Sequence, residues 1–406
     1  MTDGVPASAA VDQRPQNQQA QHQQAQLQQS QRDAINATLQ SRIAQRMSQA
    51  TASHYGFVVD IDNVGRVVSL SPGKPMRPAS TQKLFTTLPL LLDNADESLT
   101  TDVVAAEAPV GGVVAGDLVV RASGDPSLVK ANLADLARRL HKAGVSRVTG
   151  RLVLDIGSLP SNTRQTGWKW DFVPGDIGPL SPFPVDRDWW RMDSSYIAHP
   201  TLSNLGLLRQ QLNRFGIRIR GGNAISRSTT ATVVLAAHKS APMRELIKQT
   251  LRWSDNFYAE SLLAVLGGHA PVNKTSHLAG VTDKSSATDG SGLSYDDRET
   301  ARGEATLLGY AQTSPAVGDL MRALSAACRY GTLRHRFCHT PGSGMVFAKT
   351  GTLSHSSALA GYTTDALGRK VTFAVITGGV RSIDAAERAI DRAVLVLRNF
   401  RGSQQS

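Results

Sequence analysis

The feature that most constrains the fold is a proline-led stretch, Pro78-Ala79-Ser80-Thr81-Gln82-Lys83, which opens an apolar run over residues 84–88. Pro78 marks the start of a helix, because its ring cannot continue a helix that began earlier. Ser80 and Lys83 are three residues apart and share one face of that helix. A lysine that its surroundings keep neutral can take the proton of a serine hydroxyl and make it a nucleophile. By itself the pattern also fits an N-cap serine followed by an exposed lysine.

Two later triplets supply the partners that such a serine needs. Ser254-Asp255-Asn256 follows a helix predicted over residues 243–252, and Lys349-Thr350-Gly351 lies in a predicted strand. Ser254 can relay a proton to a leaving amine, and Asn256 can orient Lys83 and a substrate amide. Each triplet alone also fits a structural role, an Asx-type turn for the first and an edge strand with a bulge for the second. All three elements in this order predict a site of serine acyl transfer.

The second lysine is expected to act through its charge. Like-charge repulsion from Lys349 should lower the pKa of Lys83, and Lys349 with Thr350 can bind a substrate carboxylate. Gly351 has no side chain, so the strand backbone can approach a ligand closely there. One N–H group of this strand and that of Ser80 would form an oxyanion hole.

The length and charge of the chain limit its number of domains and its kinds of partner. A chain of 406 residues predicts two domains, and it contains no apolar run long enough to span a membrane. Residues 1–50 lack the apolar core of a signal peptide. The formal charge is +11, and its excess over residues 329–406 suits a polyanionic partner such as nucleic acid, acidic lipid or an acidic wall polymer. Nucleic acid is not expected, because no binding motif or interleaved aromatic residue accompanies the charge.

The two cysteines, Cys328 and Cys338, are close enough in sequence to form a disulfide. A disulfide is expected in an exported protein, and two free thiols are expected in the cytosol. His335 and His339 lie nearby, but the set lacks the paired spacing of zinc ligands. No metal site and no cofactor are therefore predicted.

The chain divides by composition. Eleven glutamines between residues 13 and 31 predict a disordered tail over residues 1–33. An amphipathic helix should follow from Ala34, and Pro89 should end or kink the Ser80 helix near Leu88. Residues 34–94 and 231–406 are expected to form one catalytic domain, and residues 95–230 an inserted α/β domain. The fold class predicted is α+β, with helices packed on an antiparallel sheet.

The ordered motifs resemble those of penicillin-binding proteins and class A β-lactamases. More specifically, the chain resembles the D-alanyl-D-alanine carboxypeptidase/endopeptidase family of class C low-molecular-mass penicillin-binding proteins, peptidase family S13. The resemblance covers about residues 36–400 and rests also on several secondary motifs: Gly116-Asp117-Leu118, Gly124-Asp125-Pro126, Gly167-Trp168-Lys169-Trp170-Asp171, Asp289 to Ser294, Gly331-Thr332-Leu333-Arg334 and Ala360-Gly361-Tyr362. It implies a transpeptidase-like domain interrupted between its first and second catalytic elements. It also implies substrate contacts from Thr350, Gly351, Thr352 and, for side-chain selection, Asp171.

The resemblance implies a serine-type D-Ala-D-Ala carboxypeptidase or endopeptidase that acts on peptidoglycan stem peptides outside the cytoplasm. Its nucleophile would be Ser80, and β-lactams would be covalent inhibitors. A serine β-lactamase is an alternative, but no Glu-x-x-Leu-Asn stretch follows Ser254 to activate the deacylating water. A non-catalytic wall-binding protein is a second alternative. The presence of Ser80, Lys83 and Lys349 argues against it.

Overall fold

A computed structural model describes residues 14–188 and 199–402. Its centre is a six-stranded sheet in the order β11-β12-β13-β14-β1-β2, in which every neighbouring pair is antiparallel. The predicted α+β class is confirmed. The strands are β1 His54–Ile61, β2 Gly65–Leu70, β11 Ser325–Ala326, β12 Phe347–Leu353, β13 Ser356–Thr364 and β14 Lys370–Gly378.

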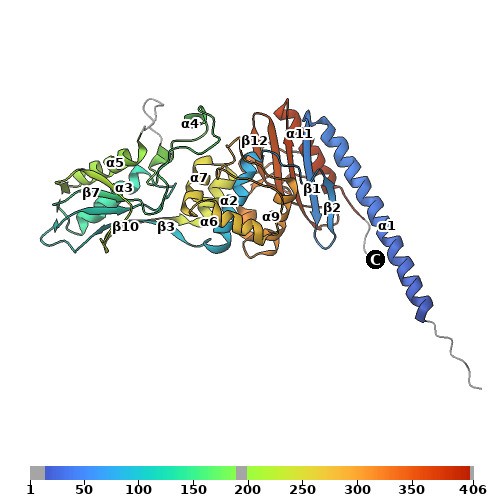
Figure 1. The fold of residues 1–406 in the computed structure, drawn as a ribbon, viewed down its shortest axis with the longest axis horizontal. Helices are drawn as coiled ribbons and strands as arrows, with labels where there is room; N and C mark the ends of the chain where they lie inside the picture. The colour runs from blue at the N-terminus through green and yellow to red at the C-terminus, as the bar shows by residue number, and fades with distance from the viewer. Residues whose placement is uncertain (1–13, 189–198, 403–406) are drawn as a thin grey trace, which may run out of the picture.

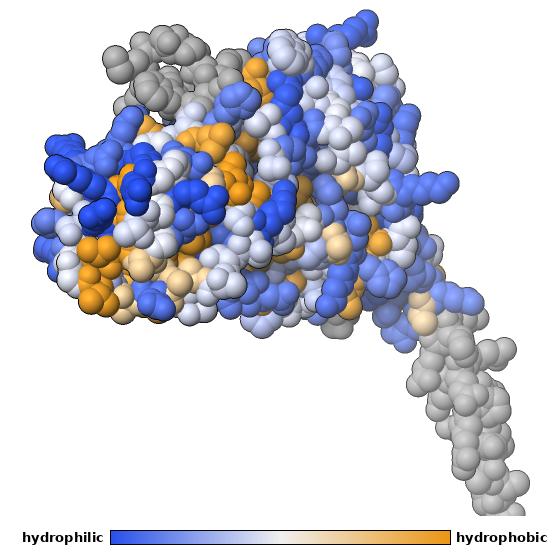
Figure 2. Space-filling model, turned by 60° about the vertical axis from the view of Figure 1, so that its left-hand side comes forward, coloured by the Kyte–Doolittle hydropathy of each residue, from blue (hydrophilic) through white to orange (hydrophobic). Residues whose placement is uncertain are grey.

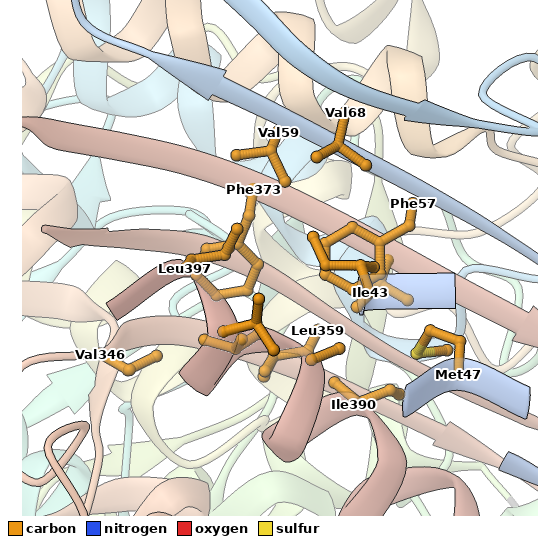
Figure 3. Packing of buried hydrophobic residues seen from close by; sticks show 14 of the residues in the cluster. Ile43, Met47, Phe57, Val59, Val68, Val346, Leu359, Phe373, Ile390 and Leu397 are labelled. Atoms are coloured by element: carbon orange, nitrogen blue, oxygen red, sulfur yellow. The ribbon is translucent and has the colours of Figure 1, made fainter. Parts of the chain in front are cut away.

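Two long helices, α1 (Arg14–Met47) and α11 (Ile383–Arg398), cover one face of this sheet (Figure 1). Ile43 and Met47 from α1 and Ile390 from α11 point into the same apolar core as Phe57 and Phe373 from the strands (Figure 3). These residues come from both ends of the sequence, so the core joins the N-terminal helix to the C-terminal one.

The opposite face of the sheet carries the helices that hold the catalytic motifs. Strand alternation explains the division, because Phe57 and Val59 of β1 face α11 while Val58 packs in the second core. The helices on this side are α2 Gln82–Asp93, α6 Met243–Arg252, α7 Asn256–Val265, α8 His269–Leu278, α9 Ala301–Thr313 and α10 Val317–Ala323.

The region between the Ser80 and Ser254 motifs forms a separate lobe at the end of the molecule away from α1 (Figure 1). One five-stranded sheet has the order β10-β3-β5-β7-β9, and a small parallel sheet has the order β4-β6-β8. Helices α3 and α5 share an apolar core with the larger sheet. The elements are β3 Ser98–Ala105, β4 Val113–Val114, β5 Leu118–Arg121, α3 Lys130–Lys142, β6 Arg147–Val148, β7 Leu152–Asp155, α4 Phe172–Gly175, α5 Pro200–Arg214, β8 Arg218–Ile219, β9 Asn223–Ser226 and β10 Val233–Pro242. On the face seen in Figure 2, apolar side chains lie in separate patches among polar ones.

The boundary of this insertion differs from the prediction at its C-terminal end. Strand β10 was assigned to the catalytic domain, but its residues pair with β3 from Val233↔Ala105 to Pro242↔Ser98. The sheet of the insertion therefore continues to Pro242, where α6 begins. The hydrophobic pattern along a strand does not identify the strand with which it pairs.

Two segments are more helical than predicted. The glutamine-rich segment is helical from Arg14 onward rather than disordered, while residues 1–13 of the predicted tail lie outside the described residues. Glutamine is a fair helix former, and the packed end around Leu39 supplies the nucleus from which the helix propagates. Helix α2 also continues through Pro89 to Asp93, because Leu88, Leu90 and Leu91 are buried in the second core. Among the described residues, no helix combines the length and apolar character needed to cross a membrane.

Candidate active site

Ser80 lies where a short 3-10 turn, η2 (Ala79–Thr81), leads into α2. Ala79 has a φ of 51°, in the left-handed region that non-glycine residues rarely adopt. Strand β12 approaches this turn so closely that a Cβ on Gly351 would lie 2.5 Å from the carbonyl oxygen of Pro78. Gly351 is thus needed for the close approach of β12 to the Ser80 turn, since any side chain there would push β12 away from Ser80.

Lys83 is fully buried beneath the serine and makes three hydrogen bonds through its Nζ. It donates to Ser80 Oγ at 2.8 Å, to Asn256 Oδ1 at 2.8 Å and to the carbonyl oxygen of Ser291 at 2.6 Å. Burial lowers the pKa of Lys83 to about 8, against the opposing charges of Asp289 and Glu260. A substantial neutral fraction is therefore present near neutral pH, as proton abstraction from Ser80 requires.

The cause of that pKa shift corrects the sequence-based expectation. Desolvation, rather than repulsion by Lys349, lowers the pKa of Lys83. Burial, with the charge of Lys83 as a second cause, holds the pKa of Lys349 well below its ordinary value. Two buried like charges disfavour each other, so a neutral Lys83 favours the charged form of Lys349.

The second triplet occupies the turn between α6 and α7 and holds the other lysine. Ser254 has a φ of 59° there, and its Oγ accepts a hydrogen bond of 2.8 Å from Lys349 Nζ. Asp255 caps α7 by accepting from the Tyr258 N–H at 3.2 Å and pairs with Arg187 at 2.7 Å. This cap fixes the start of α7 and with it the position of Asn256. The structure thus forms two hydrogen-bonded groups. One contains Ser80, Lys83 and Asn256, and the other contains Ser254 and Lys349. The two groups adjoin, because only Asp255 separates Ser254 from Asn256 in the chain.

A buried carboxylate pair behind Lys83 was not predicted as part of the site. Glu260 accepts from the N–H groups of Gly290 and Ser291 at 3.0 and 2.8 Å. Asp289 accepts from the N–H groups of Gly292 and Ser294 at 2.6 and 2.7 Å. Together they fix the loop whose Ser291 carbonyl holds Lys83. The sequence signal that could have identified this loop is the stretch from Asp289 to Ser294, which contains two glycines.

The same carboxylates connect this loop to the insertion. Gln165 Nε2 donates to Glu260 Oε2 at 3.2 Å, and Trp168 Nε1 donates to Asp289 Oδ2 at 2.8 Å. The Tyr295 N–H also donates to the carbonyl oxygen of Gly167 at 3.1 Å. Desolvation and the charge of Asp289 raise the pKa of Glu260 to about 8.

Strand β12 presents an open edge beside the nucleophile. Its neighbour β11 pairs only with Phe347 and Ala348, so no described strand pairs with this edge from Lys349 onward. Thr350 Oγ1 donates to Thr332 Oγ1 at 2.8 Å, and Thr332 lies in the 3-10 turn η4 (Gly331–Leu333). Such an edge can add an extended peptide as a further strand.

Two predicted substrate contacts are not brought to the Ser80–Lys83 group. Thr352 is exposed, and its hydroxyl donates to Glu387 Oε1 of α11 at 3.4 Å, on the opposite side of the sheet. Asp171 is also exposed, at the start of α4, and its charge acts on Lys169 and Asp176. The segment that follows Asp171 does contact the site, because the carbonyl oxygen of Asp176 accepts a hydrogen bond from Asn256 Nδ2 at 3.1 Å.

A cavity of about 850 Å³ lies beside the second triplet, between the insertion and α7. Its walls include Ser127 and Lys130 from the insertion and Asp255, Phe257 and Tyr258 from the catalytic part. Away from this cavity, Cys328 and Cys338 form a disulfide, which settles the alternative left open by the sequence.

Two buried lysines, each hydrogen-bonded to a serine, define a candidate site for a serine hydrolase that works through an acyl-enzyme. The chain belongs to the D-Ala-D-Ala carboxypeptidase 3 (S13) family, whose model matches residues 35–195 and 193–399. The predicted family and the predicted enzyme class, a serine-type D-Ala-D-Ala carboxypeptidase, are thereby confirmed.

Individual relatives agree with this assignment. The chain is 31% identical over 381 residues to Carboxypeptidase DacB of Mycolicibacterium smegmatis, with 85% of this chain and 80% of the relative covered. It is 25% identical over 439 residues to D-alanyl-D-alanine carboxypeptidase DacB of Haemophilus influenzae, with 88% and 91% covered. The crystal structure of penicillin binding protein 4 (dacB) from H. influenzae shares the fold, with a TM-score of 0.79, 21% identity and coverage of 87% and 98%. The same protein complexed with a novel β-lactam gives a TM-score of 0.75 at 21% identity, with the same coverage.

Proposed function

We propose that Ser80 is the nucleophile with which this carboxypeptidase cleaves the terminal D-Ala-D-Ala bond of peptidoglycan stem peptides. The observation that carries the proposal is the buried Lys83, whose Nζ lies 2.8 Å from both Ser80 Oγ and Asn256 Oδ1. Neutral Lys83 takes the hydroxyl proton while Ser80 Oγ attacks the carbonyl carbon. The oxyanion that forms is stabilised by the N–H of Ser80 and an N–H of β12.

Ser254 and Lys349 complete the first half of the reaction. Ser254 donates its proton to the departing amine of the terminal D-alanine, and Lys349, 2.8 Å away, replaces that proton. The proton that Lys83 took from Ser80 then restores the charge of Lys349. The charged Lys349 and the hydroxyl of Thr350 bind the terminal carboxylate of the substrate, which lies along the open edge of β12. Water then hydrolyses the Ser80 ester and returns the proton to Ser80.

β-Lactams would acylate Ser80 by the same steps, since they present a strained amide and a carboxylate to the same groups. The H. influenzae relative has been solved with a β-lactam, which supports this extension. A location outside the cytoplasm is supported by the Cys328–Cys338 disulfide and by the substrate class.

Muropeptide digestion tests the proposal directly. Purified protein should release D-alanine from pentapeptide muropeptides, detected by mass spectrometry, and Ser80→Ala should release none. Cleavage of cross-linked dimers in the same digest would add endopeptidase activity. Fluorescent penicillin separates the alternatives: long-lived labelling fits the carboxypeptidase, loss within seconds fits a β-lactamase, and absent labelling would contradict both enzymes.

A further inference from the structure

We propose that the surface formed by α1 and α11 binds a linear phosphodiester polyanion of the poly(glycerol phosphate) type. This inference goes beyond the proposed catalytic function and does not depend on it. The surface, called here the arginine ridge, consists of Arg42 and Arg46 on α1 and Arg388 and Arg392 on α11, and all four are exposed.

The packing of α1 against α11 brings the two pairs of arginines onto neighbouring helices. Arg392 hydrogen-bonds Gln49 in η1 (Ser48–Ala50), just after Arg46, and Phe400 lies beside Arg42 in a shallow hollow. The two helices therefore run antiparallel, and Arg392 lies close to the C-terminal end of α1, where Arg46 is. Within each pair the spacing is four residues, or about 6 Å along the helix axis.

The charge of the ridge is not neutralised by the described part of the chain. None of its arginines takes part in an ion pair there. The neighbouring carboxylates of Glu387 and Asp391 face Arg336, at 3.6 and 2.6 Å. Asp384 is the exposed acid nearest in sequence, one helical turn before Arg388. Exposed guanidinium groups without an ion-pair partner suit the repeated phosphates of a polymer, which they bind in a bidentate manner.

The composition of the ridge favours such a polymer over two other polyanions. The described side chains of α1 and those of α11 include no aromatic residue, and Phe400 beside Arg42 is partly buried against the apolar core, so nucleobases find little aromatic surface on which to stack. Among the described side chains of the two helices, the only strongly exposed large apolar one is Leu27, fifteen residues before Arg42, so little anchors the ridge in a lipid bilayer. The ridge also lies on the face of the sheet opposite α2, so a bound polymer leaves Ser80 accessible.

Binding of unlipidated poly(glycerol phosphate) to the full chain, followed by fluorescence anisotropy at several salt concentrations, tests the proposal. Four phosphate contacts predict a slope of log affinity against log salt of about −3, and the R388Q/R392Q variant should show about half that slope. Its affinity at low salt should fall about 10- to 30-fold.

The R147Q/R218Q variant is the matched control. Arg147 and Arg218 are register partners on β6 and β8, are exposed and belong to no ion pair within the described residues, so the net charge change is the same. This control should bind like the wild type, and all variants should keep wild-type penicillin labelling. An equal loss of affinity in both variants would show that only the net charge of the protein matters, and it would overturn the proposal. Tighter binding to anionic vesicles or to single-stranded DNA of equal charge would also overturn it, in favour of those partners.

Discussion

The ammonium group of Lys83 donates to the main-chain carbonyl oxygen of Ser291 at 2.6 Å, although 208 residues separate them in the sequence. Ser291 is itself held by the carboxylate of Glu260 through its N–H group. The position of the general base thus depends on a loop that contributes no side chain to Lys83. Since Gln165 of the insertion also bonds Glu260, the inserted region supports the catalytic lysine indirectly.

Replacing Glu260 tests that support. Glu260→Ala removes the acceptor of two N–H groups and frees the Ser291 carbonyl, so we expect penicillin acylation to slow about tenfold or more. Glu260→Gln keeps an acceptor oxygen in place and should restore most of the rate. The second-order rate constant of acylation is the measurement. Equal loss in both variants would mean that the negative charge, and not the position of the loop, matters.

The pKa of Lys83 predicts how acylation depends on pH. With a pKa of about 8, the neutral fraction of Lys83 rises about tenfold between pH 7 and pH 9. Because only neutral Lys83 accepts the serine proton, the acylation rate should rise over that interval. Stopped-flow acylation across this range gives the profile. A rate independent of pH between 7 and 9 would contradict the assignment of Lys83 as the base.

The two ends of β12 should respond differently to mutation. Lys349→Ala removes a charged donor to the ligand carboxylate, so acylation should fall about 10- to 100-fold with a smaller effect on folding. Thr352→Ala should change acylation less than about threefold, because the Thr352 hydroxyl faces Glu387 rather than the ligand. Acylation rates and thermal midpoints of both variants provide the comparison. A large loss in Thr352→Ala would restore Thr352 as a substrate contact.

The disulfide should contribute to stability and not to chemistry. Cys328 and Cys338 close a short loop with a sequence separation of 10. Replacing both by serine should lower the free energy of unfolding by about 2–3 kcal/mol, from the entropy regained by the unfolded loop. Urea unfolding of the oxidised wild type and the double variant measures the difference. An unchanged midpoint would show that the loop is already constrained by other contacts.

The parts of helix α1 before and after Leu39 should contribute differently to the free energy of unfolding. Residues 24–34 are exposed, so removing residues 1–33 should leave the stability of the domain within about 0.5 kcal/mol. In contrast, Ile43→Ala should cost about 2–5 kcal/mol, because the Ile43 side chain is fully buried among Phe57 and its neighbours. Thermal or urea unfolding distinguishes the two cases. A large loss on truncation would indicate that the outer helix has a partner surface.

Much of the central fold followed from local patterns. The helix predicted over residues 243–252 has those bounds in the structure, as Met243–Arg252. The strand predicted to hold Lys349-Thr350-Gly351 is β12. These segments carry strong periodicity and clear end signals, which depend on neighbouring residues only. The pairing of β10 with β3 could not be predicted, because alternation does not identify a partner strand.

The sequence by itself determined which side chains are present for the chemistry and in which order, from Ser80 and Lys83 to Asn256 and Lys349. Only the tertiary structure decided their states and directions. It buried Lys83 and so lowered its pKa, turned Thr352 toward α11, and placed Glu260 and Asp289 behind the base. The physical reason is that desolvation, hydrogen-bond geometry and electrostatic fields arise from segments hundreds of residues apart, whereas residue spacing records only what neighbours along the chain can do.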